Sequence, residues 1–94
     1  MPTIEEARDA LQLDQLHLPQ DVRVEEVRIN EYVDADGDDA LFVQVILSEE
    51  VDAALIPGGT ISDIKDRIRS RLQQIGVRIF CYFSFAKISE LNPQ

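Results

Sequence analysis

The stretch with the clearest potential for chemistry is "VDADGDDAL", in which four aspartates fall within six positions. Such spacing is typical of calcium loops, because an EF-hand takes ligands from the first, third and fifth positions of a twelve-residue loop. Asp34, Asp36 and Asp38 fit these positions. The sixth position, which needs glycine, holds Asp39, and the twelfth, which needs glutamate, holds Val45. The flanking segments alternate as strands do. We therefore predict a polar hairpin turn, and the alternative is weak cation binding.

The remaining reactive groups offer little material for catalysis. His17 is the single histidine and stands in the connector "QLHLP". Cys81 is the single cysteine and has the inward-facing parity of an apolar strand, where burial raises a thiol pKa and makes the group inert. The glycines of "IPGGTISDI" lack the lysine of a phosphate-binding P-loop. We expect no catalytic residue, no cofactor and no metal.

A basic stretch, "KDRIRSRLQQIGVR", is the candidate for contact with nucleic acid. On a helix, Arg67 and Arg71 form one ridge, while Lys65 and Arg69 form another. Arg78 follows the helix. We interpret these residues first as a solvated helix surface, with cations placed favourably near its C-terminus. The alternative is a contact with phosphate or with an acidic partner.

Length and charge limit the possible classes of protein. A chain of 94 residues predicts one domain, residues 1–94, that can bury a core without disulfides or metals. The net charge is −9, made up of −12 over residues 1–52 and +3 over residues 53–94. This asymmetry predicts one acidic and one basic surface. The overall acidity should repel nucleic acid and attract basic partners.

Cysteine content and hydropathy suggest where the protein works. One cysteine cannot form an internal disulfide, and "MPTIEEARDAL" is acidic where a secretion signal is basic and then apolar. No apolar run approaches the ~20 residues that span a bilayer. We therefore expect a cytoplasmic protein without membrane contact.

The patterning predicts a hairpin between residues 22 and 47. The first strand covers about residues 22–33, and the doublet Glu25 and Glu26 shifts its alternation, which is typical of a β-bulge. The second strand covers about residues 40–47. For one face to be wholly apolar, the connecting loop must have an odd number of residues. We predict a loop of three or five residues.

Two helices are also predicted, over residues 4–12 and 61–75, and the second is stopped by Gly76. A third strand, "VRIFCYFSFA", follows at once. The capping patterns that mark the two helix starts are Thr3 with Glu6 and Thr60 with Asp63. Together these elements predict an α+β fold of order αββαβ: a small three-stranded sheet, made of the hairpin and the third strand, with a covering amphipathic helix and a short N-terminal helix.

The second face of this sheet is unusually apolar. The long amphipathic helix can cover one face only, so the other must be covered by the N-terminal helix, a second copy or a different protein. Aromatic side chains flanked by charge are common at interface centres. We predict a protein interface at Tyr32, Phe42, Ile46, Phe80 and Tyr82.

Three functions remain open from sequence, and one of them is an enzyme or metal site at Asp34, Asp36 and Asp38. The first is a small acidic, non-enzymatic, bacterial-type interaction protein that binds and regulates or inhibits a partner, as an antitoxin, an immunity protein or a small subunit does. Its partner would carry a basic surface or be a second copy. The second is a KH-like module that contacts nucleic acid through the basic second helix. It follows from the strand–strand–helix–strand order, which resembles KH-like RNA-binding domains. The GxxG phosphate clamp of that class is absent.

Overall fold

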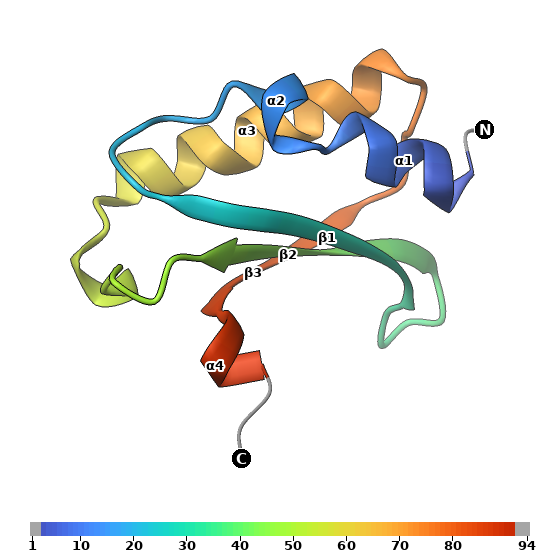
Figure 1. Cartoon of the computed structure of the whole chain (residues 1–94). Coiled ribbons are helices and arrows are strands. Elements are labelled where there is room, and N and C mark those ends of the chain that lie inside the picture. The colour runs from blue at the N-terminus through green and yellow to red at the C-terminus, as the bar shows by residue number, and fades with distance from the viewer. Residues whose placement is uncertain (1–2, 92–94) are drawn as a thin grey trace.

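The computed structural model describes residues 3–91, which form a three-stranded sheet with three helices on one side and a short helix on the other (Figure 1). In chain order the elements are α1 (Ile4–Ala10), α2 (Leu13–Leu16), β1 (Val24–Val33), β2 (Asp39–Leu47), the 3-10 turn η1 (Ala53–Leu55), α3 (Gly58–Gln74), β3 (Cys81–Lys87) and α4 (Ile88–Leu91). The predicted α+β class and αββαβ core are confirmed. The short helices α2 and α4 were not predicted.

The sheet has the order β1-β2-β3, with β2 at its centre. β1 and β2 pair antiparallel, whereas β2 and β3 pair parallel. A parallel pair needs a crossover connection, and α3 supplies it. Because β2 has a neighbour on both sides and helices above it, Val43 and Val45 are fully buried.

The hairpin has the geometry that its sequence predicts. Val33 pairs with Asp39, so the loop comprises the five residues 34–38. The register shifts between Val24 and Glu26, which places the predicted bulge at Glu25. The odd loop keeps the apolar residues of both strands on the same face of the sheet.

The helix ends agree with prediction at two places and differ at a third. Thr3 caps α1, its Oγ1 accepting a hydrogen bond from the N–H of Glu6 at 3.1 Å. Gly76 ends α3 with φ +94°, and the N–H of Val77 reaches back to the carbonyl of Leu72 at 2.9 Å, as in a Schellman motif.

The predicted start of α3 is wrong. The helix begins at Gly58 with Pro57 as its N-cap, so Thr60 lies inside the first turn. Glycine is destabilising chiefly in the middle of a helix, and Gly58 and Gly59 stand at its first two positions. Asp63 pairs with Arg67 at 3.1 Å instead of capping the helix.

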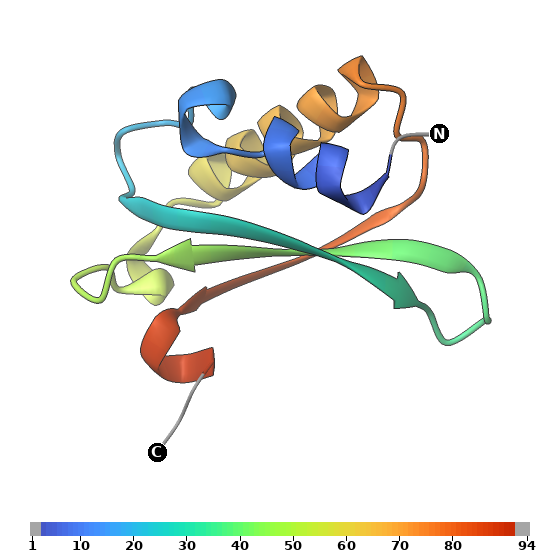
Figure 2. The same ribbon diagram turned by 45° about the vertical axis from the view of Figure 1, so that its right-hand side comes forward.

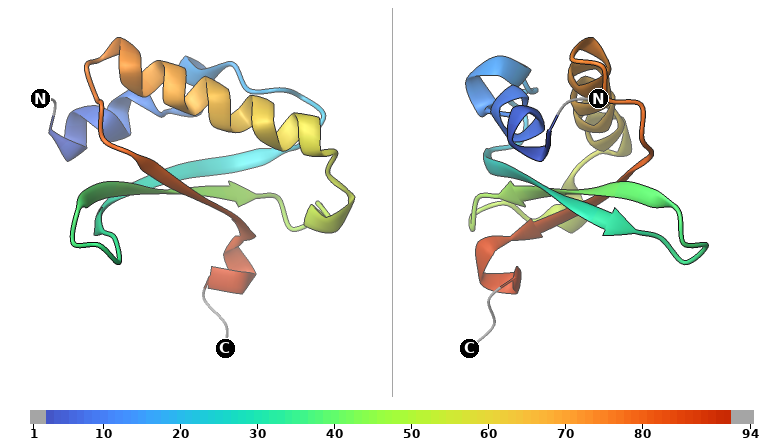
Figure 3. Two further views of the ribbon diagram at one scale, coloured as in Figure 1. Left: turned by 180° about the vertical axis from the view of Figure 1, so that it is seen from behind. Right: turned by 90° about the vertical axis from the view of Figure 1, so that its right-hand side faces the viewer.

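Both α1 and α3 pack on the same face of the sheet, as the end-on view shows (Figure 3, right). The N-terminal helix, one of the candidate covers for the second face, therefore does not cover it. The buried core between helices and sheet consists of Ala7, Leu11, Leu16, Val22, Ile29, Leu41, Val43, Val45, Leu47, Ile64, Ile68, Leu72, Val77 and Cys81.

Of the helices within residues 3–91, α4 alone lies on the second face, where it turns beneath the sheet after β3 (Figure 2). The Glu49 carboxylate accepts hydrogen bonds from the N–H and the hydroxyl of Ser89 at 3.0 and 2.8 Å. These bonds lower the pKa of Glu49. Ile46 is only 2% exposed at this end of the face and lines a shallow pocket together with Ile88.

Candidate protein interface

The other end of the second face presents a cluster of aromatic side chains, which we call the aromatic face: Tyr32, Phe42, Phe80 and Tyr82. The Tyr82 ring lies edge-on to Phe80 at 4.9 Å and to Tyr32 at 5.4 Å between centroids. Tyr32 also contacts Phe42 at 5.8 Å. Edge-to-face geometry of this kind is one of the arrangements that aromatic pairs prefer.

Strand register explains why these rings meet. Phe42 lies beside Tyr82 in the parallel pair and opposite Asn30 in the antiparallel pair. Tyr32 pairs with Ala40, so it is the diagonal neighbour of Phe42 on the same face of the sheet. The exposed fractions are 65% for Phe80, 43% for Tyr32 and 38% for Tyr82, which is high for large apolar groups that are already in contact with one another.

Of the five residues predicted for the interface, four therefore form one surface. Ile46 does not join them, because it is buried at the α4 end of the same face. Strand parity could place Ile46 on this face but could not reveal α4, since "ISEL" is too short to show helical periodicity.

The loop of residues 34–38, here called the aspartate loop, is organised by one of its own carboxylates. Oδ1 of Asp34 accepts hydrogen bonds from the N–H groups of Asp36 and Asp38 at 2.9 and 3.0 Å. The N–H of Gly37 binds the carbonyl of Asp34, and its φ of +83° is the positive value that this turn requires. Asp34 thus serves as a turn-forming residue.

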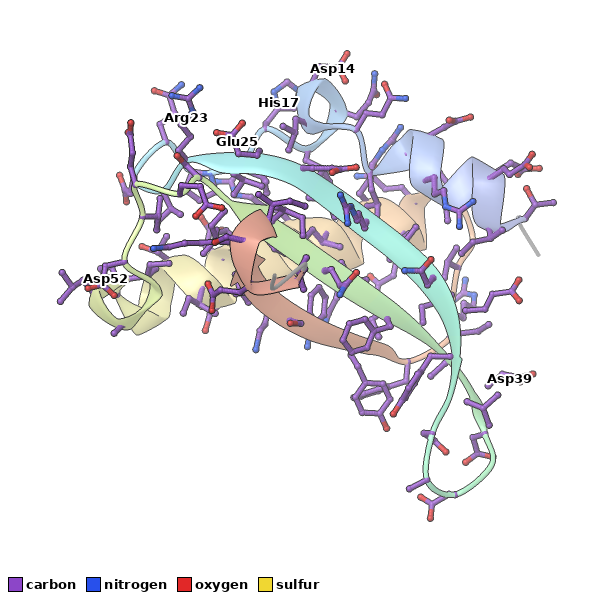
Figure 4. All side chains as sticks on the ribbon, turned by 60° about the horizontal axis from the view of Figure 1, so that its bottom comes forward. Asp14, His17, Arg23, Glu25, Asp39 and Asp52 are labelled. Atoms are coloured by element: carbon purple, nitrogen blue, oxygen red, sulfur yellow. The ribbon has the colours of Figure 1, made fainter. Side chains whose placement is uncertain are left out.

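The aspartate loop borders the aromatic face. Burial raises the pKa of Tyr82, and the negative charges of Asp34 and Asp36 raise it further. Asp39, at the base of the hairpin, lies at the opposite end of the sheet from Asp52 and Arg23 (Figure 4). The aromatic face therefore has the carboxylates of Asp34 and Asp36 along its hairpin side.

Two of the predicted basic contact residues are engaged within the molecule. Arg71 donates from Nε to the carbonyl of Ala10 at 3.2 Å, and Arg67 donates from a terminal nitrogen to the carbonyl of His17 at 2.6 Å. These carbonyls end α1 and α2, where helix dipoles favour a cation. Arg71 also reaches Gln15 at 3.3 Å. The two arginines fasten α3 to the N-terminal helices.

The other basic residues are placed differently. Lys65 and Arg69 both lie over the ring of Phe83, at 5.9 and 5.0 Å from its centroid. Arg69 also pairs with Asp66 at 3.5 Å. Arg78 is exposed in the link between α3 and β3. On α3 the basic residues thus lie in two groups, with Arg67 and Arg71 against the N-terminal helices and Lys65 and Arg69 over Phe83.

The single histidine and cysteine have ordinary structural surroundings. His17 is exposed and ends α2 in the left-handed conformation, with φ 50°. Cys81 is buried among core residues, and burial raises the pKa of its thiol. Within residues 3–91, no group of three or more His, Cys, Asp or Glu side chains is arranged to hold a metal ion. In the same part of the chain, no helix is both long and apolar enough to cross a membrane.

Comparisons of the chain with protein-family models, with curated proteins and with solved structures find no match.

Proposed function

We propose that this protein is a small, non-enzymatic interaction protein whose aromatic face binds a partner protein with a basic surface. One observation carries the proposal: Phe80, Tyr32 and Tyr82 are 65%, 43% and 38% exposed, contact one another, and lie on a sheet face that neither α1 nor α3 covers. Aromatic groups that are held by mutual packing lose little conformational entropy on binding and are enriched at interface hot spots.

Charge favours a basic partner over a second copy. The chain has a net charge of −9, and the aspartate loop borders the aromatic face. Two copies that met through this face would bring two acidic loops together, whereas a basic partner would be steered toward it. A cytoplasmic regulator, such as an antitoxin-like or immunity-like inhibitor, or a small subunit of a complex, fits this chemistry.

The test is a pull-down from the native host with matched variants. Phe80→Ala and Tyr82→Ala should reduce capture of the partner at least tenfold, because each removes ring contact area from the surface. Leu55→Ala is the control, since Leu55 is an apolar side chain that is 77% exposed but lies on η1. Capture should weaken as salt is raised, because the acidic loop contributes to the encounter.

Thermal unfolding and sedimentation of the same variants complete the test. Phe80→Ala should leave the unfolding temperature nearly unchanged, because the side chain is mostly exposed. The proposal is wrong if all three variants capture the same proteins equally well. Self-association of the wild type that Tyr82→Ala abolishes would replace the basic partner by a second copy.

The alternative function is a KH-like contact with nucleic acid through the basic helix α3. One observation supports it: Lys65 and Arg69 flank the Phe83 ring, and proteins that bind single strands combine cations with aromatic rings. Since Arg67 and Arg71 already bind carbonyls of this chain, few cations remain to neutralise phosphates.

A further inference from the structure

A pocket of about 350 Å³ opens at the hairpin end of the sheet, on the side that the helices cover. It lies between α1, the ends of β1 and β2, and the link from α3 to β3. Its floor is apolar, because Ala7, Leu41 and Val77 line it and are 2%, 6% and 4% exposed. Ile4 and Ile79 extend the apolar wall. The floor is part of the packed core and is therefore preformed.

Two carboxylates stand among the residues that line this pocket. Glu31 pairs with Leu41, and Val33 pairs with Asp39, so strand parity places Glu31 and Asp39 on the helix-covered face as diagonal neighbours. Diagonal positions across a strand pair are roughly 7–8 Å apart, within reach of a single bridging group. Both residues are exposed, and none of the ion pairs within residues 3–91 includes either of them.

Among residues 3–91, no basic side chain lines the pocket to compensate this negative charge. Arg78 is next to Ile79 in the chain, but its side chain does not line the pocket. The N-terminus of α1 contributes a partial positive charge, which Glu5 and Glu6 in its first turn offset. The pocket thus combines an apolar floor with two carboxylates, and its complement is a cation on an apolar stem.

We propose that this pocket takes an arginine side chain presented by the partner protein, an inference that rests on the proposed function. The methylene groups would lie on the apolar floor, and the guanidinium would donate hydrogen bonds to Glu31 and Asp39. Arginine fits better than lysine, because its planar group carries five donors and can bridge two carboxylates. Charge-assisted bonds of this kind are stronger than those between neutral groups.

The pocket adjoins the aromatic face at one residue. Tyr32 lines the pocket, and its ring also contacts Tyr82 and Phe42. The two features lie on opposite faces of the sheet, so a partner would meet both by wrapping around its hairpin end. The pocket would then fix the register of a complex whose contact area comes from the aromatic rings.

The test uses a probe of defined structure, N-acetyl-arginine N-methylamide, titrated into the isotope-labelled protein and followed by NMR. The matched control probe is the citrulline counterpart, which is nearly isosteric but neutral. The amide signals of Ala7, Leu41 and Val77 should shift and saturate, with a dissociation constant on the order of 1–10 mM for so small a ligand. The citrulline probe should bind at least tenfold more weakly.

Two double variants with the same charge change complete the design. Glu31→Gln with Asp39→Asn should weaken arginine binding at least tenfold, whereas Glu50→Gln with Asp14→Asn, which do not line this pocket, should leave it within about twofold. Equal binding of the two probes, retained affinity in the first variant, shifts confined to the aspartate loop, or no saturation at all would each overturn the inference. None of these outcomes would change the expected loss of partner capture by Phe80→Ala, so the proposed function is tested separately.

Discussion

Arg71 offers the sharpest test of how the helical layer is held together. Its Nε donates to the carbonyl of Ala10 at 3.2 Å, and its terminal nitrogens reach Gln15 and Gln74 at 3.3 and 3.2 Å. The bond to Ala10 is part-buried and joins positions 61 residues apart in the chain. Replacing Arg71 by Ala leaves the last carbonyl of α1 without this cationic donor. We expect α1 and α2 to loosen from α3.

The magnitude follows from these contacts. A hydrogen bond to a charged group contributes about 1.5–3 kcal/mol when buried, and partial exposure reduces this value. We therefore expect Arg71→Ala to lower the free energy of unfolding by about 1–2 kcal/mol. For a domain of this size, each 1 kcal/mol lowers the unfolding temperature by roughly 4–8 °C. Arg71→Lys keeps the charge but lacks the guanidinium fork, so it should recover less than half of the loss.

The control is Arg23→Ala, which removes the same charge from an ion pair whose side chains are 72% and 48% exposed. That change should lower the free energy of unfolding by no more than about 0.5 kcal/mol. Urea unfolding with an unchanged slope would show that stability alone has changed. If Arg71→Ala and Arg23→Ala lower the free energy of unfolding by equal amounts, the carbonyl contacts of Arg71 do not stabilise the fold and the reasoning is refuted.

Two further predictions concern the charged surfaces. The first replaces the carboxylates of the aspartate loop by amides, through Asp34→Asn, Asp36→Asn and Asp38→Asn. The fold should stay intact, because asparagine keeps the Oδ1 acceptor at position 34. The free energy of unfolding should rise by up to about 1 kcal/mol, because like-charge repulsion falls. Calorimetric binding of calcium by the wild type at micromolar affinity would contradict this interpretation of the loop. Binding of RNA or DNA should be weaker than micromolar at about 150 mM salt. A tighter gel shift that Lys65→Ala with Arg69→Ala abolishes would instead establish the nucleic-acid alternative.

Much of the fold could be predicted because local rules decide it. The phase shift at Glu25, the odd hairpin loop and the stop at Gly76 each follow from backbone geometry within a few residues. The start of α3 was missed because glycines favour loops on average, although a first helical turn tolerates them. The short helices α2 and α4 were missed because four residues cannot show a helical period.

The internal use of the basic residues could not be predicted. Periodicity correctly placed Arg67 and Arg71 on one ridge, but their acceptors are backbone carbonyls of His17 and Ala10, which are 50 and 61 residues away. Backbone carbonyls carry no sequence signal, since every residue has one. The ridge of Arg67 and Arg71 therefore holds α3 to the N-terminal helices, and this use of the two cations could be seen only in the folded structure.

The side of the sheet on which α1 packs decides whether the aromatic residues are core or surface. β2 is apolar on both faces, with Val43 0% exposed on one and Ile46 2% exposed on the other, so strand parity alone gives no preference. The choice depends on Ala7 and Leu11, which join the same core as the residues of α3, and on the two arginine contacts to the ends of α1 and α2. Since α1 and α3 share one face, no helix in the described part of the chain covers the rings at the hairpin end. The contacts that hold α1 beside α3 thus leave the aromatic face exposed. The proposed function depends on this exposure, because a partner can bind only rings that α1 does not cover.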